Sequence, residues 1–228
     1  VNDGIPTNHH YVLWYDAERT ILIRHEAFPY IIPERFEAPK WVYLSSTGEN
    51  AESFHEELAV WFAAHPETKL AFQPGTFQIK MGKEKLKVLY AIADVFASNK
   101  EEAQIILGTD ESDIKILLTR MRALGPKIVL ITDGPNGAYA YDGAQMLRVP
   151  MYPDPKEPYD RTGAGDAMTS TFVAALALGK SLEEALAWGP VNSMAVVQEI
   201  GAQKGLLSRD TLEGFLRNAP AGYEVTAL

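Results

Sequence analysis

The chain of 228 residues contains no cysteine, which excludes both a disulfide framework and a thiolate zinc site. It also lacks any Asn-x-Ser/Thr sequence, and none of its apolar runs approaches the roughly 20 residues that a membrane helix needs. Residues 1–4 have neither the basic start nor the apolar core of a signal peptide. From these absences we expect a cytoplasmic protein that does not bind a membrane.

Positive charge is scarce, because 21 Lys and Arg residues face 30 Asp and Glu residues and leave a net charge of −9. A general nucleic-acid binder needs a cationic face, so nucleic acid is excluded as a partner. A single nucleotide is still compatible with this charge if Mg²⁺ and helix N-termini supply local positive potential. All five histidines precede residue 66, so a carboxylate is the natural proton acceptor in the rest of the chain.

The N-terminal part predicts a β-hairpin that is separate from the rest of the chain. Residues 11–15 and 20–23 are rich in β-branched and aromatic side chains, and the four residues between them, 16–19, form a turn. A connector with three prolines comes next. We therefore divide the chain into a hairpin and connector over residues 1–35 and an α/β core over residues 36–228.

From residue 40 onward, apolar strands alternate with amphipathic helices. We expect strands at 41–44, 69–72, 94–97, 127–132, 138–141 and 145–149, and helices at 49–64, 83–91, 100–107, 112–124, 165–178, 182–199 and 209–217. Serial βα units predict a mostly parallel sheet with helices on both faces, a three-layer α/β/α sandwich. Ligands of such sheets bind beyond the carboxyl ends of the strands.

A glycine-rich run, Thr-Gly-Ala-Gly-Asp at residues 162–166, stands where a loop turns into a helix. Its small residues let a ligand approach the backbone, and the free N–H groups of a helix start attract phosphate. Taken alone, the run also fits a tight turn with Asp166 as a helix cap. It is not a Walker loop, because no Gly-Lys-Ser/Thr is present, and Met168 breaks a Gly-x-Gly-x-x-Gly pattern.

With the two residues before it, the run reads Asp-Arg-Thr-Gly-Ala-Gly-Asp and resembles the signature of the ribokinase-like (PfkB) family of carbohydrate and nucleoside kinases. This resemblance implies that the N–H groups of Gly163, Ala164 and Gly165 form an anion hole for the transferred phosphoryl group. It also implies that Asp166 accepts the proton of the attacking hydroxyl. Phosphoryl transfer needs this combination of positioning, charge stabilisation and a nearby base. Arg161 occupies a variable position of the signature, where it either reaches a phosphate or stays solvated.

The resemblance also implies a Mg²⁺ site. Asn99 and Glu102 match the Asn-x-x-Glu motif that organises Mg²⁺ beside the nucleotide phosphates in the family, and Asp160 joins them as an expected ligand. Such oxygen ligands suit Mg²⁺. Alone, Asn99 and Glu102 would be a helix N-cap and its capping-box partner, and the two roles are compatible.

Further residues are implied as contacts of ATP. Thr132, Gly134 and Gly137 match the family's Thr-x-Gly-x-x-Gly segment along the phosphates and ribose, although the glycines also fit a tight turn between two strands. Asn192 and Gly201, on and after the helix at 182–199, are expected at the adenine pocket. The loop at 73–75 stands where the family usually has Asn and Arg, but it lacks the Arg, so no role is assigned to it.

The hairpin resembles the later part of the family's β-lid, which covers the acceptor and in several members pairs between subunits, so a homodimer is expected. Family chains carry a further set of βα units before this point, with the residues that grip sugar hydroxyls. The resemblance therefore covers nearly all of this chain but only the later part of the family fold. We expect a piece of a longer protein that is weakly active or inactive alone.

The implied function is ATP-dependent, Mg²⁺-assisted phosphorylation of a hydroxyl on a sugar, sugar acid, sugar phosphate or nucleoside. A non-catalytic nucleotide-binding or regulatory module is the first alternative, but such a module needs no base at position 166. A vitamin-precursor kinase of the same superfamily is the second, and the lid-like hairpin argues against it. An NAD-dependent Rossmann enzyme fits poorly, because the glycine run comes late in the chain. The sequence does not name the acceptor.

Overall fold

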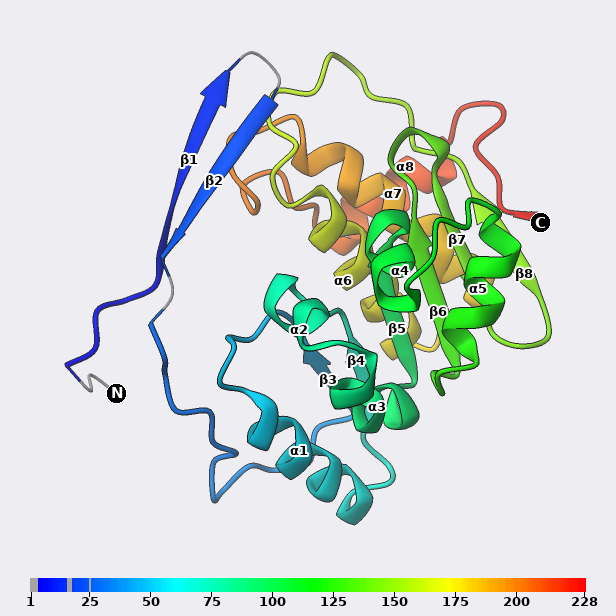
Figure 1. The fold of residues 1–228 in the computed structure, drawn as a ribbon. Helices are drawn as coiled ribbons and strands as arrows, with labels where there is room; N and C mark the ends of the chain where they lie inside the picture. Colours follow the sequence, from blue (N-terminus) through cyan, green and yellow to red (C-terminus); the bar gives the residue numbers. More distant parts are fainter. Residues whose placement is uncertain (1–3, 16–17, 25) are drawn as a thin grey trace.

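The computed structural model describes residues 4–15, 18–24 and 26–228 (Figure 1). Strands β1 (His9–Tyr15) and β2 (Glu18–Arg24) pair antiparallel and form a two-stranded sheet of their own. The prediction of a separate hairpin is therefore confirmed. Strand β1 ends at Tyr15 as predicted but begins at His9, and β2 begins at Glu18, closer to the turn than predicted. Residues 16 and 17 of that turn lie outside the described residues.

The main sheet has seven strands in the sequential order β3-β4-β5-β6-β7-β8-β9. Its first four strands are parallel: β3 (Trp41–Leu44), β4 (Lys69–Phe72), β5 (Val95–Asn99) and β6 (Ile128–Thr132). The helices between them are α1 (Glu52–Ala64), α2 (Thr76–Met81), α3 (Lys83–Ile92), α4 (Lys100–Leu107) and α5 (Ile114–Arg122). Because each strand is added on the same side, right-handed crossovers place these helices on one face of the sheet.

The remaining strands are antiparallel to their neighbours: β7 (Ala138–Tyr141), β8 (Met146–Val149) and β9 (Thr226–Ala227). A 3-10 turn, η1 (Gly134–Asn136), separates β6 from β7. Two reversals bring β8 back to the direction of β3–β6, so the sheet is mostly parallel, as predicted. Helices α6 (Ala164–Ala177), α7 (Leu182–Val196) and α8 (Arg209–Arg217) cover the face opposite α1–α5 (Figure 1).

Alternation along the buried strands explains the three layers. In β5, Phe96 packs into the core under α1–α5, whereas Val95 and Ala97 pack into the core under α6–α8. In β6, Leu130 packs into the core under α6–α8, whereas its neighbours Val129 and Ile131 pack into the core under α1–α5. Successive side chains of a strand point to opposite faces, so a strand that is apolar throughout requires a cover on both sides. The predicted α/β/α sandwich is confirmed.

Some elements differ from the prediction. Helix α2 was not expected, because its six residues lie between Gly75 and Gly82 and look like a loop. Strand β9 was also missed, and α7 ends at Val196 instead of residue 199. The domain boundary between residues 35 and 36 stays a prediction. Within the described part of the chain, no helix combines the length and the apolar character needed to cross a membrane.

Candidate active site

Asp166 lies in the first turn of α6, at the edge of the sheet where β4, β5 and β6 end. It lines two cavities. The larger, of about 740 Å³, separates the hairpin from the core and is called the hairpin cavity; the hairpin side is formed by Asn8, His9, His10, Ile21 and Ile23. The smaller, of about 200 Å³, is called the glycine-loop cavity. Asp166 therefore stands where the two spaces meet.

The glycine-loop cavity unites most of the residues that the sequence singled out. Asn99 comes from the end of β5, Thr132 from the end of β6, and the glycine run from the start of α6. Its lining residues are Gln73, Ser98, Asn99, Glu102, Thr132, Arg161, Gly163, Ala164, Gly165, Asp166 and Thr169. Arg161 is the cationic side chain in this set, beside the carboxylates of Glu102 and Asp166.

The two glycines of the run differ in what surrounds them. Gly163 has φ +82°, a left-handed conformation that a residue with a side chain adopts only with strain. Gly165 has no positive φ, and a Cβ built on it meets no atom within 4 Å. The open space above Gly165 belongs to the cavity, where backbone N–H groups of the α6 N-terminus are available to an anion.

Asp160 is buried and holds the glycine run to the loop after α7. Its Oδ1 accepts a hydrogen bond from the Thr162 N–H at 2.7 Å, and its Oδ2 accepts one from the Gly201 N–H at 2.9 Å. Asp160 and Gly201 do not line the glycine-loop cavity. The structure thus gives both residues a role in shaping the loop, and their predicted contacts with Mg²⁺ and ATP stay predictions.

Asn99 and Glu102 form the capping box of α4. Asn99 Oδ1 accepts the Glu102 N–H at 2.7 Å, and Glu102 Oε2 accepts the Asn99 N–H at 2.9 Å. Burial raises the pKa of the Glu102 carboxyl, and the charges of Asp166 and Glu101 add to the rise, while the hydrogen bond from Asn99 opposes it. Glu102 and Asp166 thus place two carboxyl groups beside the glycine run, and a cation bound there would favour their charged forms.

The oxygen atoms of this corner suit a hard cation. Glu102 and Asp166 approach each other closely enough to interact, and the Asn99 amide oxygen lines the same cavity. Mg²⁺ is typically bound by one or two carboxylates, with water and substrate phosphates completing the shell. Across the described ranges, no group of three or more His, Asp or Glu side chains is placed to hold a metal by itself. The donor set therefore fits a cation that arrives with a phosphate ligand.

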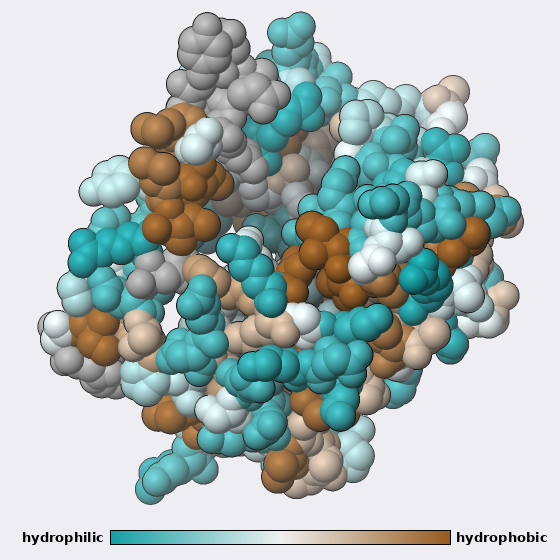
Figure 2. All heavy atoms as spheres, in the orientation of Figure 1, coloured by the Kyte–Doolittle hydropathy of each residue, from teal (hydrophilic) through white to brown (hydrophobic). Residues whose placement is uncertain are grey.

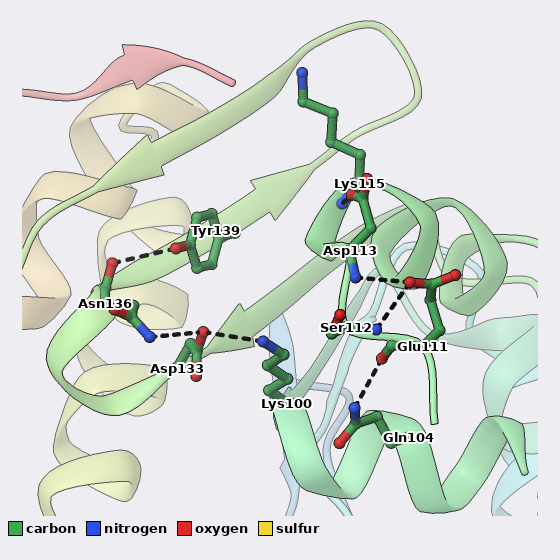
Figure 3. Close-up of polar contacts among 9 residues, drawn as sticks. All are labelled: Lys100, Gln104, Glu111, Ser112, Asp113, Lys115, Asp133, Asn136 and Tyr139. Atoms are coloured by element: carbon green, nitrogen blue, oxygen red, sulfur yellow. Dashed lines mark hydrogen bonds and ion pairs between the residues drawn. The ribbon is translucent and has the colours of Figure 1, made fainter. Parts of the chain in front are cut away.

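A polar bridge fixes the loop after β6 relative to α4 (Figure 3). Asp133 Oδ2 lies 3.5 Å from Lys100 Nζ and accepts a hydrogen bond from Asn136 Nδ2 at 3.1 Å. Gly137 closes this turn with φ +94°, and a Cβ there would lie 2.1 Å from the Val149 carbonyl oxygen. The bridge therefore fixes the end of β5, at Asn99, relative to the end of β6, at Thr132.

Two residues that the sequence analysis did not assign belong to a chain of hydrogen bonds that ends on Asp166. Gln73, directly after β4, donates a hydrogen bond from Nε2 to Asp166 Oδ1 at 2.9 Å. The Tyr43 hydroxyl, on β3, donates to Gln73 Oε1. The general rule that polar residues after strands face the ligand would have found Gln73; nothing in the sequence alone indicates Tyr43.

A third cavity, of about 150 Å³, adjoins the glycine run on the side of α7 and is mostly apolar. It is lined by Thr132, Gly134, Gly137, Ala138, Met151, Tyr152, Asp154, Pro158, Arg161, Ala164, Gly165, Met168, Pro190, Ser193, Met194 and Val197. Thr132, Gly134 and Gly137, which the sequence predicts as contacts of ATP, thus line one cavity with Ala164 and Gly165 of the glycine run. An apolar slot with a few polar groups is the usual form of a pocket for a flat ring.

Asn192 does not line this apolar cavity, although the sequence analysis expected it to face the adenine. Its side chain is buried, with Nδ2 donating to Thr171 Oγ1 at 2.8 Å and Oδ1 accepting the Leu207 N–H at 2.9 Å. The next residue, Ser193, lines the cavity instead. On a helix, adjacent residues point about 100° apart, so the two side chains face different surroundings. The predicted contact of Asn192 with ATP stays a prediction.

Comparison with known proteins identifies the family of the chain. The family model described as pfkB family carbohydrate kinase matches residues 1–209. Among curated proteins, the chain is 33% identical over 132 residues to an ATP-dependent 6-phosphofructokinase of Thermoanaerobacterium thermosaccharolyticum, and 32% identical over 124 residues to a ribokinase of Bacillus subtilis. These alignments cover 58% and 54% of this chain but only 40% of each relative.

Solved structures show the same fold. The ribokinase of Arabidopsis thaliana, solved with ribose and ATP, superposes with a TM-score of 0.77 at 23% identity, over 93% of this chain and 70% of that one. A nucleoside kinase of Methanocaldococcus jannaschii gives a TM-score of 0.73 at 20% identity, over 93% of this chain and 68% of that one. With the family model matching most of its length, the chain belongs to the pfkB family of carbohydrate kinases.

Proposed function

We propose that the protein containing this chain transfers the γ-phosphoryl group of ATP to a hydroxyl of a sugar, sugar acid, sugar phosphate or nucleoside. The observation that carries this proposal is the position of Asp166, which lines both the hairpin cavity and the glycine-loop cavity. A base that deprotonates an acceptor at the moment of phosphoryl transfer has to touch both substrates. A pure nucleotide-binding module has no use for a carboxylate at this junction.

In the proposed reaction, the acceptor hydroxyl enters from the hairpin cavity and gives its proton to Asp166. Its oxygen forms a bond to the γ-phosphorus, and the bond between that phosphorus and the bridging oxygen breaks. The products are the phosphorylated acceptor and ADP. Backbone N–H groups of residues 163–165 stabilise the charge on the transferred group, and Arg161, which lines this cavity, adds a cation beside it.

The nucleotide is proposed to extend from the glycine run into the apolar cavity. Its adenine would occupy the apolar part, and Thr132, Gly134 and Gly137 would lie along its ribose and phosphates. Asn99 and Glu102 would hold Mg²⁺, which when bound neutralises phosphate charge during the transfer. The capping box orients both side chains before any ligand arrives, so little order has to be created on binding.

We also propose that the hairpin mediates a homodimer. On one face of the hairpin, Tyr11, Leu13 and Leu22 are 63%, 55% and 51% exposed. Hydrophobic residues also gather on the surface of the hairpin region in Figure 2. A two-stranded ribbon with an open apolar face is marginally stable alone. Replacing Leu22 with Lys should convert the dimer to a monomer in analytical ultracentrifugation, whereas a wild-type chain that already sediments as a monomer would refute the dimer.

The test of the kinase function is an assay of ADP release by the complete natural chain that contains these residues. Mg·ATP is offered with a panel of sugars, sugar phosphates, sugar acids and nucleosides, together with a hydroxymethylpyrimidine as a vitamin precursor. The proposal expects turnover with one class from the sugar and nucleoside panel. Turnover with the vitamin precursor alone would move the protein to that branch of the superfamily. ATP binding without turnover on any acceptor would favour the non-catalytic module.

A further inference from the structure

We infer that Gln73, held in place by Tyr43, positions the Asp166 carboxylate for proton transfer. This inference rests on the proposed role of Asp166 as the base and adds two residues to it. Tyr43 lies on β3 and Gln73 directly after the neighbouring strand β4, and the Gln73 N–H also donates to the Leu44 carbonyl oxygen at 2.9 Å. The sheet therefore fixes the backbone at residue 73, so the Gln73 side chain extends from a rigid position.

The chemistry of the three groups allows one direction of hydrogen bonding. An ionised carboxylate only accepts, so the amino group of Gln73 has to face Asp166 Oδ1, at 2.9 Å. The amide oxygen then points to Tyr43, whose hydroxyl donates to it. Burial, and then the charge of Asp166, raise the pKa of Tyr43 above its usual value. The hydroxyl therefore keeps its proton at neutral pH and donates it to the amide oxygen of Gln73.

The consequence for Asp166 is a defined orientation. Asp166 is exposed in the first turn of α6, where its carboxylate would otherwise rotate freely. Glu102 is close enough for its charge to interact with Asp166 and would push the carboxylate away. The amide donor anchors Oδ1 from the side of β4, which leaves Oδ2 to accept the hydroxyl proton. A reacting group held in one geometry avoids the loss in rate that misplacement causes.

The test compares Gln73→Met and Gln73→Glu with wild type, in the complete natural chain with its acceptor. Gln73→Glu keeps the size and the acceptor for Tyr43 but removes the amino donor, so it remains informative if Gln73→Met folds poorly. Because a hydrogen bond to a charged group is lost, kcat should fall by about 10–100-fold in both variants, with the KM for ATP unchanged. Gln145→Met, the same change in an exposed turn before β8, is the control and should keep wild-type kcat.

Tyr43→Phe tests the relay itself. Removing the hydroxyl should lower kcat by about 2–10-fold, as expected for one neutral hydrogen bond. In a Gln73→Met background, Tyr43→Phe should have no further effect, because the hydroxyl acts only through the amide. A purely structural role of Tyr43 on β3 would instead give losses that multiply, and that result would overturn the relay.

An Asp166→Asn variant separates this inference from the proposed function. If Asp166→Asn loses turnover while both Gln73 variants keep wild-type kcat, the positioning role of Gln73 is contradicted and the role of Asp166 as the base is supported. If Asp166→Asn keeps turnover, both the proposed role of Asp166 as the base and the positioning role of Gln73 are contradicted. Support requires that Gln73→Met lowers kcat in the wild-type background and has no effect in the Asp166→Asn background.

Discussion

Gly163 and Ala202 lie so close together that a Cβ on Gly163 would come within 2.5 Å of the Ala202 Cβ and 2.8 Å of its Cα. The contact joins the glycine run to the loop after α7, beside the hydrogen bond from the Gly201 N–H to Asp160. Gly165, two residues along, faces open space. Packing inside the protein therefore requires glycine at position 163, whereas Gly165 leaves room for a ligand.

The two glycines should respond differently to alanine. Gly163→Ala combines a positive φ with a collision against backbone, so it should cost about 1–3 kcal/mol of unfolding free energy. Gly165→Ala has no collision in the protein and gains helix propensity, so its stability should equal or exceed that of wild type. Its methyl group would still occupy the cavity, so turnover and ATP affinity should fall. Urea unfolding and calorimetric ATP binding measure both effects. A stable Gly165→Ala protein with wild-type turnover would contradict the assignment of this space to the phosphates.

Glu102 should make stability depend on pH in a definite direction. Its pKa in the folded protein is raised above the usual 4.5, chiefly by burial, so the folded state binds the proton more tightly than the unfolded chain. The associated stability is full below pH 4.5 and is lost as the pH rises through the folded pKa. Glu102→Gln stays neutral and keeps an oxygen for the capping box. Its melting temperature should exceed that of wild type at pH 7, and the difference should shrink toward pH 4.5. A difference that is the same at both pH values would contradict this explanation.

The same substitution tests the Mg²⁺ site. Ligand at 100 times its Kd stabilises a protein by about 2.7 kcal/mol. Wild type should therefore gain thermal stability from Mg·ATP, and Glu102→Gln should gain less, with turnover that needs more Mg²⁺. Glu101→Gln, on the adjacent exposed position of α4, serves as the control and should retain the wild-type Mg²⁺ requirement. Equal Mg²⁺ requirements in wild type and Glu102→Gln would contradict the proposed role of Glu102 in binding Mg²⁺.

Asn192→Ala tests whether Asn192 contacts ATP, as the sequence predicts, or serves only the stability of the fold through its buried hydrogen bonds. Because it breaks the bonds to Thr171 and Leu207 in a site that is only 7% exposed, it should cost about 1–3 kcal/mol of unfolding free energy. The Kd for ATP should stay unchanged. Asn218→Ala, at an exposed helix end, should change stability by less than about 0.5 kcal/mol. A weakened ATP affinity with unchanged stability would instead support the predicted contact of Asn192 with ATP.

Much of the fold could be predicted because strong local patterns determine it. The run at 127–132 is apolar almost throughout, which requires a cover on both faces, and Leu130 and Ile131 indeed belong to the two opposite cores. Helix α2 could not be predicted in this way. Gly75 resembles a loop residue, yet it is needed because a Cβ there would lie 2.0 Å from Ser46 Oγ, a contact between distant segments.

The candidate site could be predicted where its residues follow one another along the chain. Asn99 and Glu102 are three residues apart and bond to each other across one helical turn, so their spacing alone indicated a pair. The contact of Gln73 with Asp166 spans 93 residues, and no local pattern records it. The predicted Mg²⁺ contact of Asp160 rests on its place in the signature and stays a prediction. Its hydrogen bond with the Gly201 N–H joins residues 41 positions apart, so local spacing did not indicate it.

The central claim is that Asp166 is the proton acceptor, and the most direct measurement is the turnover of Asp166→Asn alongside its ATP affinity. The substitution preserves shape and removes the base, so kcat should fall by about 10²–10⁴-fold. Calorimetry should show that Mg·ATP still binds within about threefold of wild type, because the glycine run is intact. Turnover that stays within a few fold of wild type, with ATP bound normally, would contradict the account.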